Sequence, residues 1–275
     1  MPPNINVSGK LIKQEPVSSD SNSYKKSVIS FFEEISQITL FTVRFFKEVF
    51  RPPYEFKELV KQGYLIGYKS FPLIAITGFI MGLVLTIQSR PTLAEFGAES
   101  WLPAMVAVSI VREIGPVITA LIFAGKVGSS IGAELASMKV TEQIDAMEVS
   151  GTNPFKFLVV TRITAITLML PILVIYTGLI GMLGAFINIH QNELTSFPAF
   201  ISSAFKTISF LDIFSSIFKA ICYGFTIGVA ACYQGYNAQN GTKGVGNAAN
   251  VAVVLSMFMI FIEEMVIVQF VNAIR

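Results

Sequence analysis

The chain has 275 residues, of which 53% are hydrophobic and only 14% are charged, with a formal net charge of +2. A soluble domain carries about 25% charged residues. This composition therefore excludes an ordinary water-facing surface and predicts a membrane protein. Half of the 20 lysines and arginines precede Phe71, and a basic N-terminal quarter suits an anionic cytoplasmic leaflet. We expect membrane lipids around the chain and no nucleic-acid partner.

The first 26 residues are polar and have no apolar core. Such a stretch excludes a cleavable secretory signal and predicts a disordered cytosolic tail over residues 1–26. A transit peptide is poor in acidic residues, so Glu15 and Asp20 count against that interpretation as well.

Residues 27–50 have the period of an amphipathic helix. Its apolar face consists of Val28, Phe31, Phe32, Ile35, Ile38, Phe45, Phe46 and Val49. The opposite face carries too many charges for a membrane span, so we expect an interfacial amphipathic segment over residues 27–70. The alternative is that the apolar face packs against the protein's own helices. Arg51-Pro52-Pro53 ends the helix, because proline cannot continue it.

Residues 71–275 form the expected transmembrane domain, since roughly 20 apolar residues are needed for each span. The five predicted spans are 71–89, 102–131, 163–189, 212–234 and 248–271. The fold class is thus an all-α membrane protein with five transmembrane helices preceded by an amphipathic interfacial helix. Lysine and arginine flank the loops on the N-terminal side more often than those on the other side. This asymmetry predicts a cytosolic N-terminus, a cytosolic 235–247 loop and an external C-terminus.

Charged residues interrupt the predicted spans at Arg112, Glu113, Lys219 and Glu264. A charge at the centre of a span costs about 2.5–3.5 kcal/mol on insertion scales, so each should face a cavity or a partner. Two interpretations stay open: Arg112 and Glu113 line a substrate path, or they form a structural ion pair with another helix. The possible partners in that pair are Lys219, Glu263 and Glu264.

Small residues recur at three- and four-residue spacing in the second and fourth spans, and such faces let helices approach closely in lipid. The expected helix-packing positions are Gly125, Gly128, Gly132, Gly224 and Gly228.

Residues 140–150 predict a short helix outside the membrane, with Glu142, Asp145 and Glu148 on one side and apolar residues on the other. Composition alone favours a solvated surface helix here.

No cofactor, metal site or catalytic group is expected. The glycine-rich stretch 240–246 lacks the residue order of a phosphate-binding loop. Cys222 and Cys232, if on one helix, lie roughly 15 Å apart, too far for a disulfide. His190 has no potential metal ligand beside it in the sequence.

The segment 112–147 resembles the signature of the MlaE-type permease family. The matching runs are Arg112–Pro116, Gly125–Gly128, Ala133–Leu135 and Met138–Met147, followed later by Gly244–Gly246. The likeness covers roughly residues 71–271. Ala136-Ser137, Lys126 and Glu264 are mild departures from the usual pattern.

The resemblance implies the membrane subunit of an ABC transporter that moves phospholipids or related lipids and is not itself an enzyme. Two permeases would sit side by side in a bacterial inner (plasma) membrane, each docked on a separate cytosolic ATPase that hydrolyses ATP. The lipid path would lie at the dimer interface and open toward a periplasmic MCE-domain partner. The short cytosolic helix between spans two and three would be the coupling helix, with Thr141, Glu142, Gln143, Asp145 and Glu148 contacting the ATPase.

An ion-coupled secondary transporter is the alternative, with Arg112, Glu113 and Glu264 as coupling charges. Five spans do not divide into the inverted repeats of many such transporters. An intramembrane lipid-modifying enzyme is a weaker alternative, because no catalytic constellation is apparent.

Overall fold

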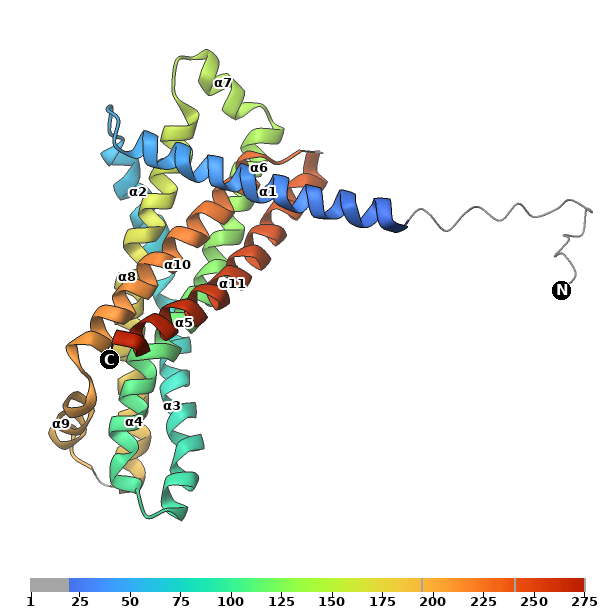
Figure 1. Ribbon diagram of the computed structural model, residues 1–275. Coiled ribbons are helices and arrows are strands. Elements are labelled where there is room, and N and C mark those ends of the chain that lie inside the picture. Colours follow the sequence, from blue (N-terminus) through green and yellow to red (C-terminus); the bar gives the residue numbers. More distant parts are fainter. Residues whose placement is uncertain (1–19, 194, 240, 275) are drawn as a thin grey trace, which may run out of the picture. The chain divides into compact units, whose positions relative to one another are not determined.

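The computed structural model describes residues 20–193, 195–239 and 241–274, and within these ranges the chain forms helices and no strand (Figure 1). It divides into two compact units, one ending at Val43 and the other running from Arg44 to the C-terminal end. Most of the expected 1–26 tail lies outside the described residues. The first helix begins at Asp20 rather than at Ser27, since residues 20–26 contain no proline or glycine that would break it.

Helix α1 (Asp20–Val49) ends just before the Arg51-Pro52-Pro53 sequence, as expected. In its last turn, the rings of Phe45 and Phe46 lie 5.6 and 5.5 Å from the ring of Phe225. The side chain of Phe45 is buried. At this end of α1, therefore, the apolar face packs against the protein's own helices.

Five helical stretches are long and apolar enough to cross a membrane by length and composition, which confirms the predicted fold class. The first joins α2 (Phe56–Tyr68) to α3 (Phe71–Glu95), and the fourth and fifth are α10 (Phe210–Tyr236) and α11 (Gly241–Ile274). The third joins η4 (Phe155–Val160) to α8 (Thr161–Glu193). The second consists of six pieces: η1 (Glu99–Trp101), α4 (Leu102–Ser109), η2 (Ile110–Ile114), α5 (Gly115–Phe123), η3 (Ala124–Gly128) and α6 (Ser129–Val140). The short helices α7 (Gln143–Val149) and α9 (Phe197–Thr207) lie between spans.

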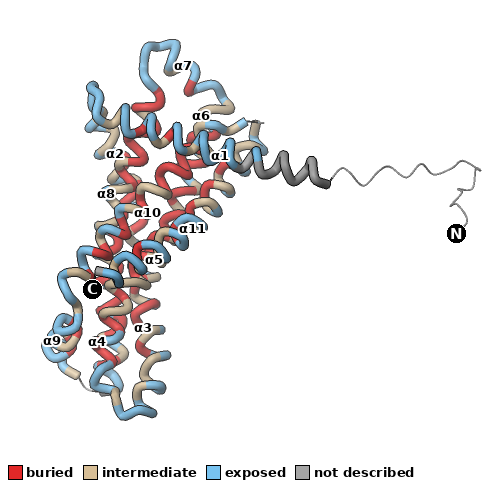
Figure 2. Tube along the Cα trace, viewed as in Figure 1, coloured by how far each residue is buried: buried red, intermediate tan, exposed pale blue. Residues whose placement is uncertain are grey.

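Within the unit that begins at Arg44, α8 packs against α2, α3 and α10, and α11 packs against α6 and α10. Helix α7 and the α10–α11 turn lie at one end, and α9 and the α3–α4 turn lie at the other (Figure 1). Buried positions concentrate where α6, α8 and α10 meet (Figure 2). In the most apolar stretch of the third span, 61% of the residues are buried, whereas in that of the fifth span only 22% are. Helix α11 therefore presents a broad apolar face outward.

Glycines permit the closest helix crossings, though not all where the sequence predicted them. A β-carbon at Gly132, Gly224 or Gly228 would meet a neighbouring helix at 3.0–3.3 Å. Gly125 and Gly128 make only ordinary contacts, at 3.8 and 3.5 Å. The tightest crossing of two spans is that of α3 and α8, where a β-carbon at Gly82 or Gly184 would overlap the partner backbone.

The end of the bundle opposite α7 has its own apolar core. Phe200 of α9 is buried there against α4 and α8. Leu102, Val106 and Ile189 belong to the same cluster. These contacts tie the connection between the third and fourth spans firmly to the bundle.

Candidate functional site

A π-helical turn presents the two charges of the second span. The segment η2 contains both Arg112 and Glu113, and it is followed directly by Gly115-Pro116. Pro116 has no N–H and cannot bond the carbonyl of Arg112, four residues earlier. Lys219 Nζ lies 3.3 Å from that carbonyl oxygen and donates to it from α10. Such π-helical turns are frequent at functional sites.

Lys219 is the centre of an ion-pair network between three spans. Its amine binds the carboxylate of Glu113 and lies 2.9 Å from Glu264 Oε1. Glu113 in turn accepts from Arg112 Nε at 3.0 Å. The Lys219 side chain is 1% exposed, so its charge depends entirely on these partners. The structure thus brings together Arg112, Glu113, Lys219 and Glu264, the four intramembrane charges singled out in the sequence.

Sequence reasoning missed three further members of this network. The hydroxyl of Tyr223 donates to Glu264, and Asn272 Oδ1 accepts from Arg112 Nη2 at 2.8 Å. Asp212 Oδ1 lies 3.9 Å from Arg112 Nε. A usable signal existed for Tyr223, because it lies four residues after Lys219 and so on the same helical face. Asp212 lies seven residues before Lys219 and so on that face too, but its contact with Arg112 depends on how α10 meets η2.

The network is accessible from one side. The side chains of Arg112 and Glu113 are 18% and 33% exposed, whereas Lys219 behind them is enclosed. Glu263, next to Glu264, points to a different partner and accepts from the hydroxyl of Thr226. The arrangement can hold three helices together and, from its open side, meet a polar group of a ligand or of another protein chain.

Helix α7 has the two faces that the sequence predicted. Ile144 is fully buried, and Glu142, Asp145 and Glu148 are exposed. Asp145 pairs with Lys139 at 2.8 Å. Glu142 precedes the helix with φ of 58°, a left-handed conformation uncommon for a residue other than glycine. Strained positions of this kind cluster at functional sites.

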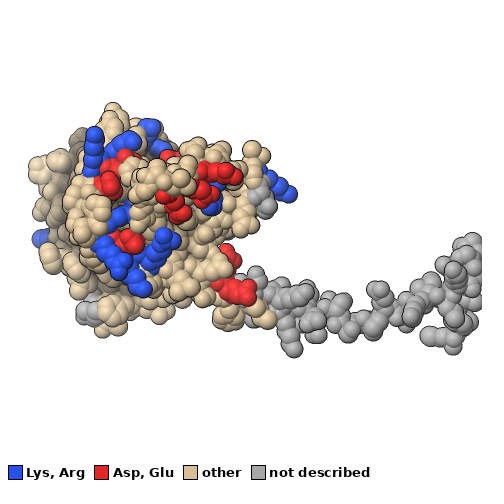
Figure 3. All heavy atoms as spheres, turned by 90° about the horizontal axis from the view of Figure 1, so that it is seen from above, with Lys and Arg blue, Asp and Glu red and all other residues tan. Residues whose placement is uncertain are grey.

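Thr141 and Gln143 lie beside each other at the start of α7, with Gln143 Nε2 donating to Thr141 Oγ1 at 3.0 Å. The helix stands beyond the ends of α6 and α8 (Figure 1), and both signs of charge gather at this end of the unit (Figure 3). The five predicted contact residues therefore form one exposed surface, with Ile144 attaching it to the bundle.

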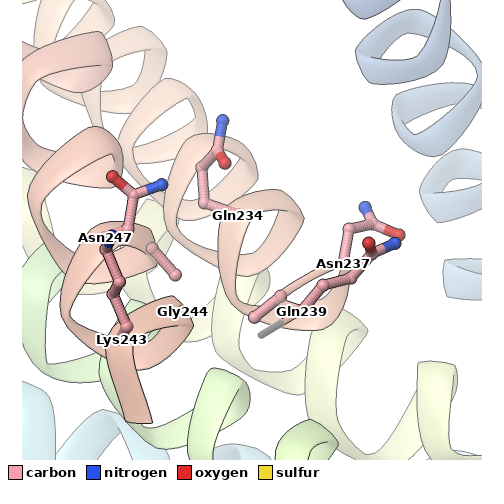
Figure 4. A pocket seen from close by; sticks show the side chains of 8 residues that line it. Gln234, Asn237, Gln239, Lys243, Gly244 and Asn247 are labelled. Carbon is pink, nitrogen blue, oxygen red and sulfur yellow. The ribbon is translucent and has the colours of Figure 1, made fainter. Parts of the chain in front are cut away.

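A polar cavity of about 580 Å³ lies at the α10–α11 turn, at the same end as α7 (Figure 4). It is lined mainly by amide side chains and a lysine, including Gln234, Asn237, Lys243 and Asn247. Gly244 is required there because a β-carbon would overlap the Gln239 carbonyl. The glycine-rich stretch is thus a tight entry into α11, and its shape follows from helix geometry.

Comparison with known proteins decides the family. Residues 59–270 match the family model described as Permease MlaE. The chain belongs to the MlaE permease family. A probable ABC transporter permease of Rickettsia felis is 37% identical over 90% of this chain and 96% of its own length. A probable ABC transporter permease of Synechocystis is 31% identical over 87% of this chain and 91% of its own length. One of Pyropia yezoensis is 35% identical over 77% of this chain and 81% of its own length.

The resemblance seen in the sequence is thereby confirmed, and the chain is an ABC transporter permease of the MlaE family. The matched segment of the permease contains α7 and the four charges Arg112, Glu113, Lys219 and Glu264. It ends before Asn272 and begins after α1. The four charges and α7 thus both lie within the part of the permease that matches the family model.

Proposed function

We propose that this permease is the homodimeric membrane subunit of a system that transports phospholipids or related lipids. A separate cytosolic ATPase would supply the energy, and an MCE-domain protein would meet the opposite end. The main support for this proposal is the structure of helix α7. It combines a buried anchor, Ile144, with exposed acidic side chains on a short helix outside the spans. An acidic surface of this kind fits a basic groove on a partner.

The charges around the spans support a cytosolic position for α7. Lys126, Lys139, Lys156 and Lys243 flank the spans at its end of the bundle. Fewer cations flank the end with α9. By the positive-inside rule, α7 then faces the cytosol of a bacterial inner membrane. The N-terminus of the first span lies on the same side.

The outward face of α11 and the open side of the network support a dimer. Arg112 and Glu113 would be unfavourable against hydrocarbon, because charged groups in lipid cost several kcal/mol. A second permease placed against this side would cover them together with the exposed rings of Phe258 and Phe270. A lipid passing between the two copies would present its polar head to these charges.

The ion-coupled alternative is less well supported. Glu113 and Glu264 are both occupied by Lys219, and Glu264 also by Tyr223. A coupling carboxylate would have to give up these partners before it could bind an ion. Five spans also do not divide evenly into two inverted repeats.

Pull-down of the ATPase tests the proposal. Glu142→Lys together with Asp145→Lys should release the ATPase that co-purifies with tagged wild-type permease. Truncating one partner of a desolvated charge pair costs roughly 2–5 kcal/mol, which weakens a complex by more than tenfold. The double variant should remain folded and inserted, because both side chains are exposed.

The matched control is Glu95→Lys with Glu99→Lys, which makes the same charge change on exposed side chains at the opposite end. ATPase recovery is normalised to membrane-inserted permease in each case. Loss with the α7 variant alone supports the coupling role. Equal recovery by the α7 variant and wild type would remove that role from α7 and much of the case for a separate ATPase.

A further inference from the structure

A second polar site lies apart from the network, in a groove between α2 and the second span. The groove has a volume of about 200 Å³ and is lined by residues of α2, the α2–α3 junction, η3 and α6. It forms because α2 packs against α8, which leaves the side of α2 toward η3 and α6 open. Lys69 and Ser70 lie at the point where the apolar part of the first span begins. The groove is therefore at the level of lipid headgroups.

Two lysines line this groove, Lys69 from the turn between α2 and α3 and Lys126 from η3. Lys126 Nζ donates to the backbone carbonyl of Lys69. This bond holds the Lys126 amine close to Lys69. Each ammonium group has three donors, so this bond leaves two on Lys126. Within the described residues, neither lysine forms an ion pair. The groove thus concentrates positive charge next to the membrane.

The acid in the lining does not cancel this charge. Glu134 is engaged by Arg162 at 2.7 Å, and the Arg162 side chain is almost fully buried. The pair is neutral, which leaves the two lysines as an excess of positive charge. Gln62 and Ser130 add polar groups, and apolar side chains such as Leu65 and Ile131 form the rest of the wall. A groove with cations beside apolar walls fits an amphiphile with a negative head.

The backbone of the second span is built to present Lys126. The residue lies within η3, a π-helical turn, as Arg112 and Glu113 lie within η2. A π-helical turn inserts an extra residue and re-aims the side chains that follow. Lys126 is thereby directed toward α2, while α6 continues against α10 and α11.

We propose that this groove binds the headgroup phosphate of an anionic phospholipid from the leaflet on the α7 side, held between Lys69 and Lys126. The site is separate from the ion-pair network and does not depend on which molecule the permease transports. Charge-assisted bonds to a phosphate are the strong class of hydrogen bond, and two of them from separate segments of the chain would fix the headgroup in place. The bound lipid would fill the gap between α2 and the second span.

Native mass spectrometry of the detergent-purified full-length permease tests the site, with phosphatidylglycerol and phosphatidylcholine titrated separately. Wild type should retain phosphatidylglycerol in preference to phosphatidylcholine. Lys69→Gln with Lys126→Gln should weaken phosphatidylglycerol binding by about tenfold or more, because both charge-assisted contacts are lost. Lys69→Arg with Lys126→Arg should retain it, which separates loss of charge from loss of fold.

The matched control is Lys57→Gln with Lys61→Gln, which removes two exposed charges from α2 that do not line the groove. Equal phosphatidylglycerol binding by the groove variant and wild type, or equal loss in the control, would overturn the proposal. So would displacement of the lipid by millimolar inorganic phosphate, which would identify a free-anion site. A disulfide between two copies through Ser130→Cys in native membranes would show instead that a second chain covers the groove.

Discussion

Lys219→Met is the sharpest test of the ion-pair network. The wild-type amine binds Glu113 and lies 2.9 Å from Glu264, and its side chain is 1% exposed. Methionine keeps the length of the side chain but leaves both carboxylates facing an apolar group. Removing one partner of a buried ion pair costs about 3–5 kcal/mol. At roughly 1.4 kcal/mol per factor of ten, the equilibrium constant for folding should fall by two to more than three orders of magnitude.

Fluorescence-detected size exclusion and thermal melting of the detergent-extracted permease measure this loss. Lys219→Met combined with Glu113→Gln and Glu264→Gln should recover folding, because both carboxylates that depend on Lys219 are neutralised and Arg112 keeps Asp212 at 3.9 Å. Lys206→Met, on the exposed surface of α9, is the control and should melt like wild type. If Lys219→Met alone also melts like wild type, the carboxylates do not depend on Lys219, and the network as described is wrong.

Three further predictions concern packing and topology. Gly184→Leu should destabilise the permease by at least about 1–3 kcal/mol, since the leucine side chain would meet the α3 backbone. Gly178→Leu is the control, because a side chain there has open space. Equal melting temperatures of the two variants would refute the close crossing. Phe45→Asp with Phe46→Asp should lower the yield of assembled permease, because both rings pack on α10. If the double variant assembles as well as wild type, this end of α1 serves only to connect the N-terminal segment to the bundle. A single cysteine at Val245, in a background without other cysteines, should react with a membrane-impermeant reagent only after the cells are opened; labelling of intact cells would reverse the orientation.

Hydropathy sufficed to predict the five spans, because each contains a long apolar stretch bounded by charged residues. Residue 71, for example, was expected to begin the first span, and α3 begins at Phe71. The ends are less well defined by composition. Helix α2 extends the first apolar stretch back to Phe56 and η4 extends the third back to Phe155, since polar residues near the membrane surface remain helical.

The contacts between spans could be predicted only in part. A charge inside a span requires a partner, and this alone predicted that Arg112 would lie near an acid. Which acid it contacts depends on helix rotation, and the π-helical turn at η2 changes that rotation locally. The α3–α8 crossing at Gly82 and Gly184 was missed for a related reason: single glycines in apolar spans are common, and only the crossing point shows which ones are required.

The second span connects the two features that define this permease. Helix α7 follows α6 directly, and α6 continues through η3 and α5 to the Arg112-Glu113 pair without leaving the span. A displacement of α7 by an ATPase, as proposed, would therefore pass through the turn at Thr141-Glu142 into α6 and then act on η2 along the second span. At η2 the displacement would strain bonds to two other spans together, the Lys219–Glu113 pair on α10 and the Arg112–Asn272 bond on α11. A purely structural ion pair needs no open side, yet Glu113 is one-third exposed while Lys219 is enclosed. We therefore expect the network to hold α10 and α11 to the second span at rest, and to leave Glu113 available to a polar group that arrives when the helices part.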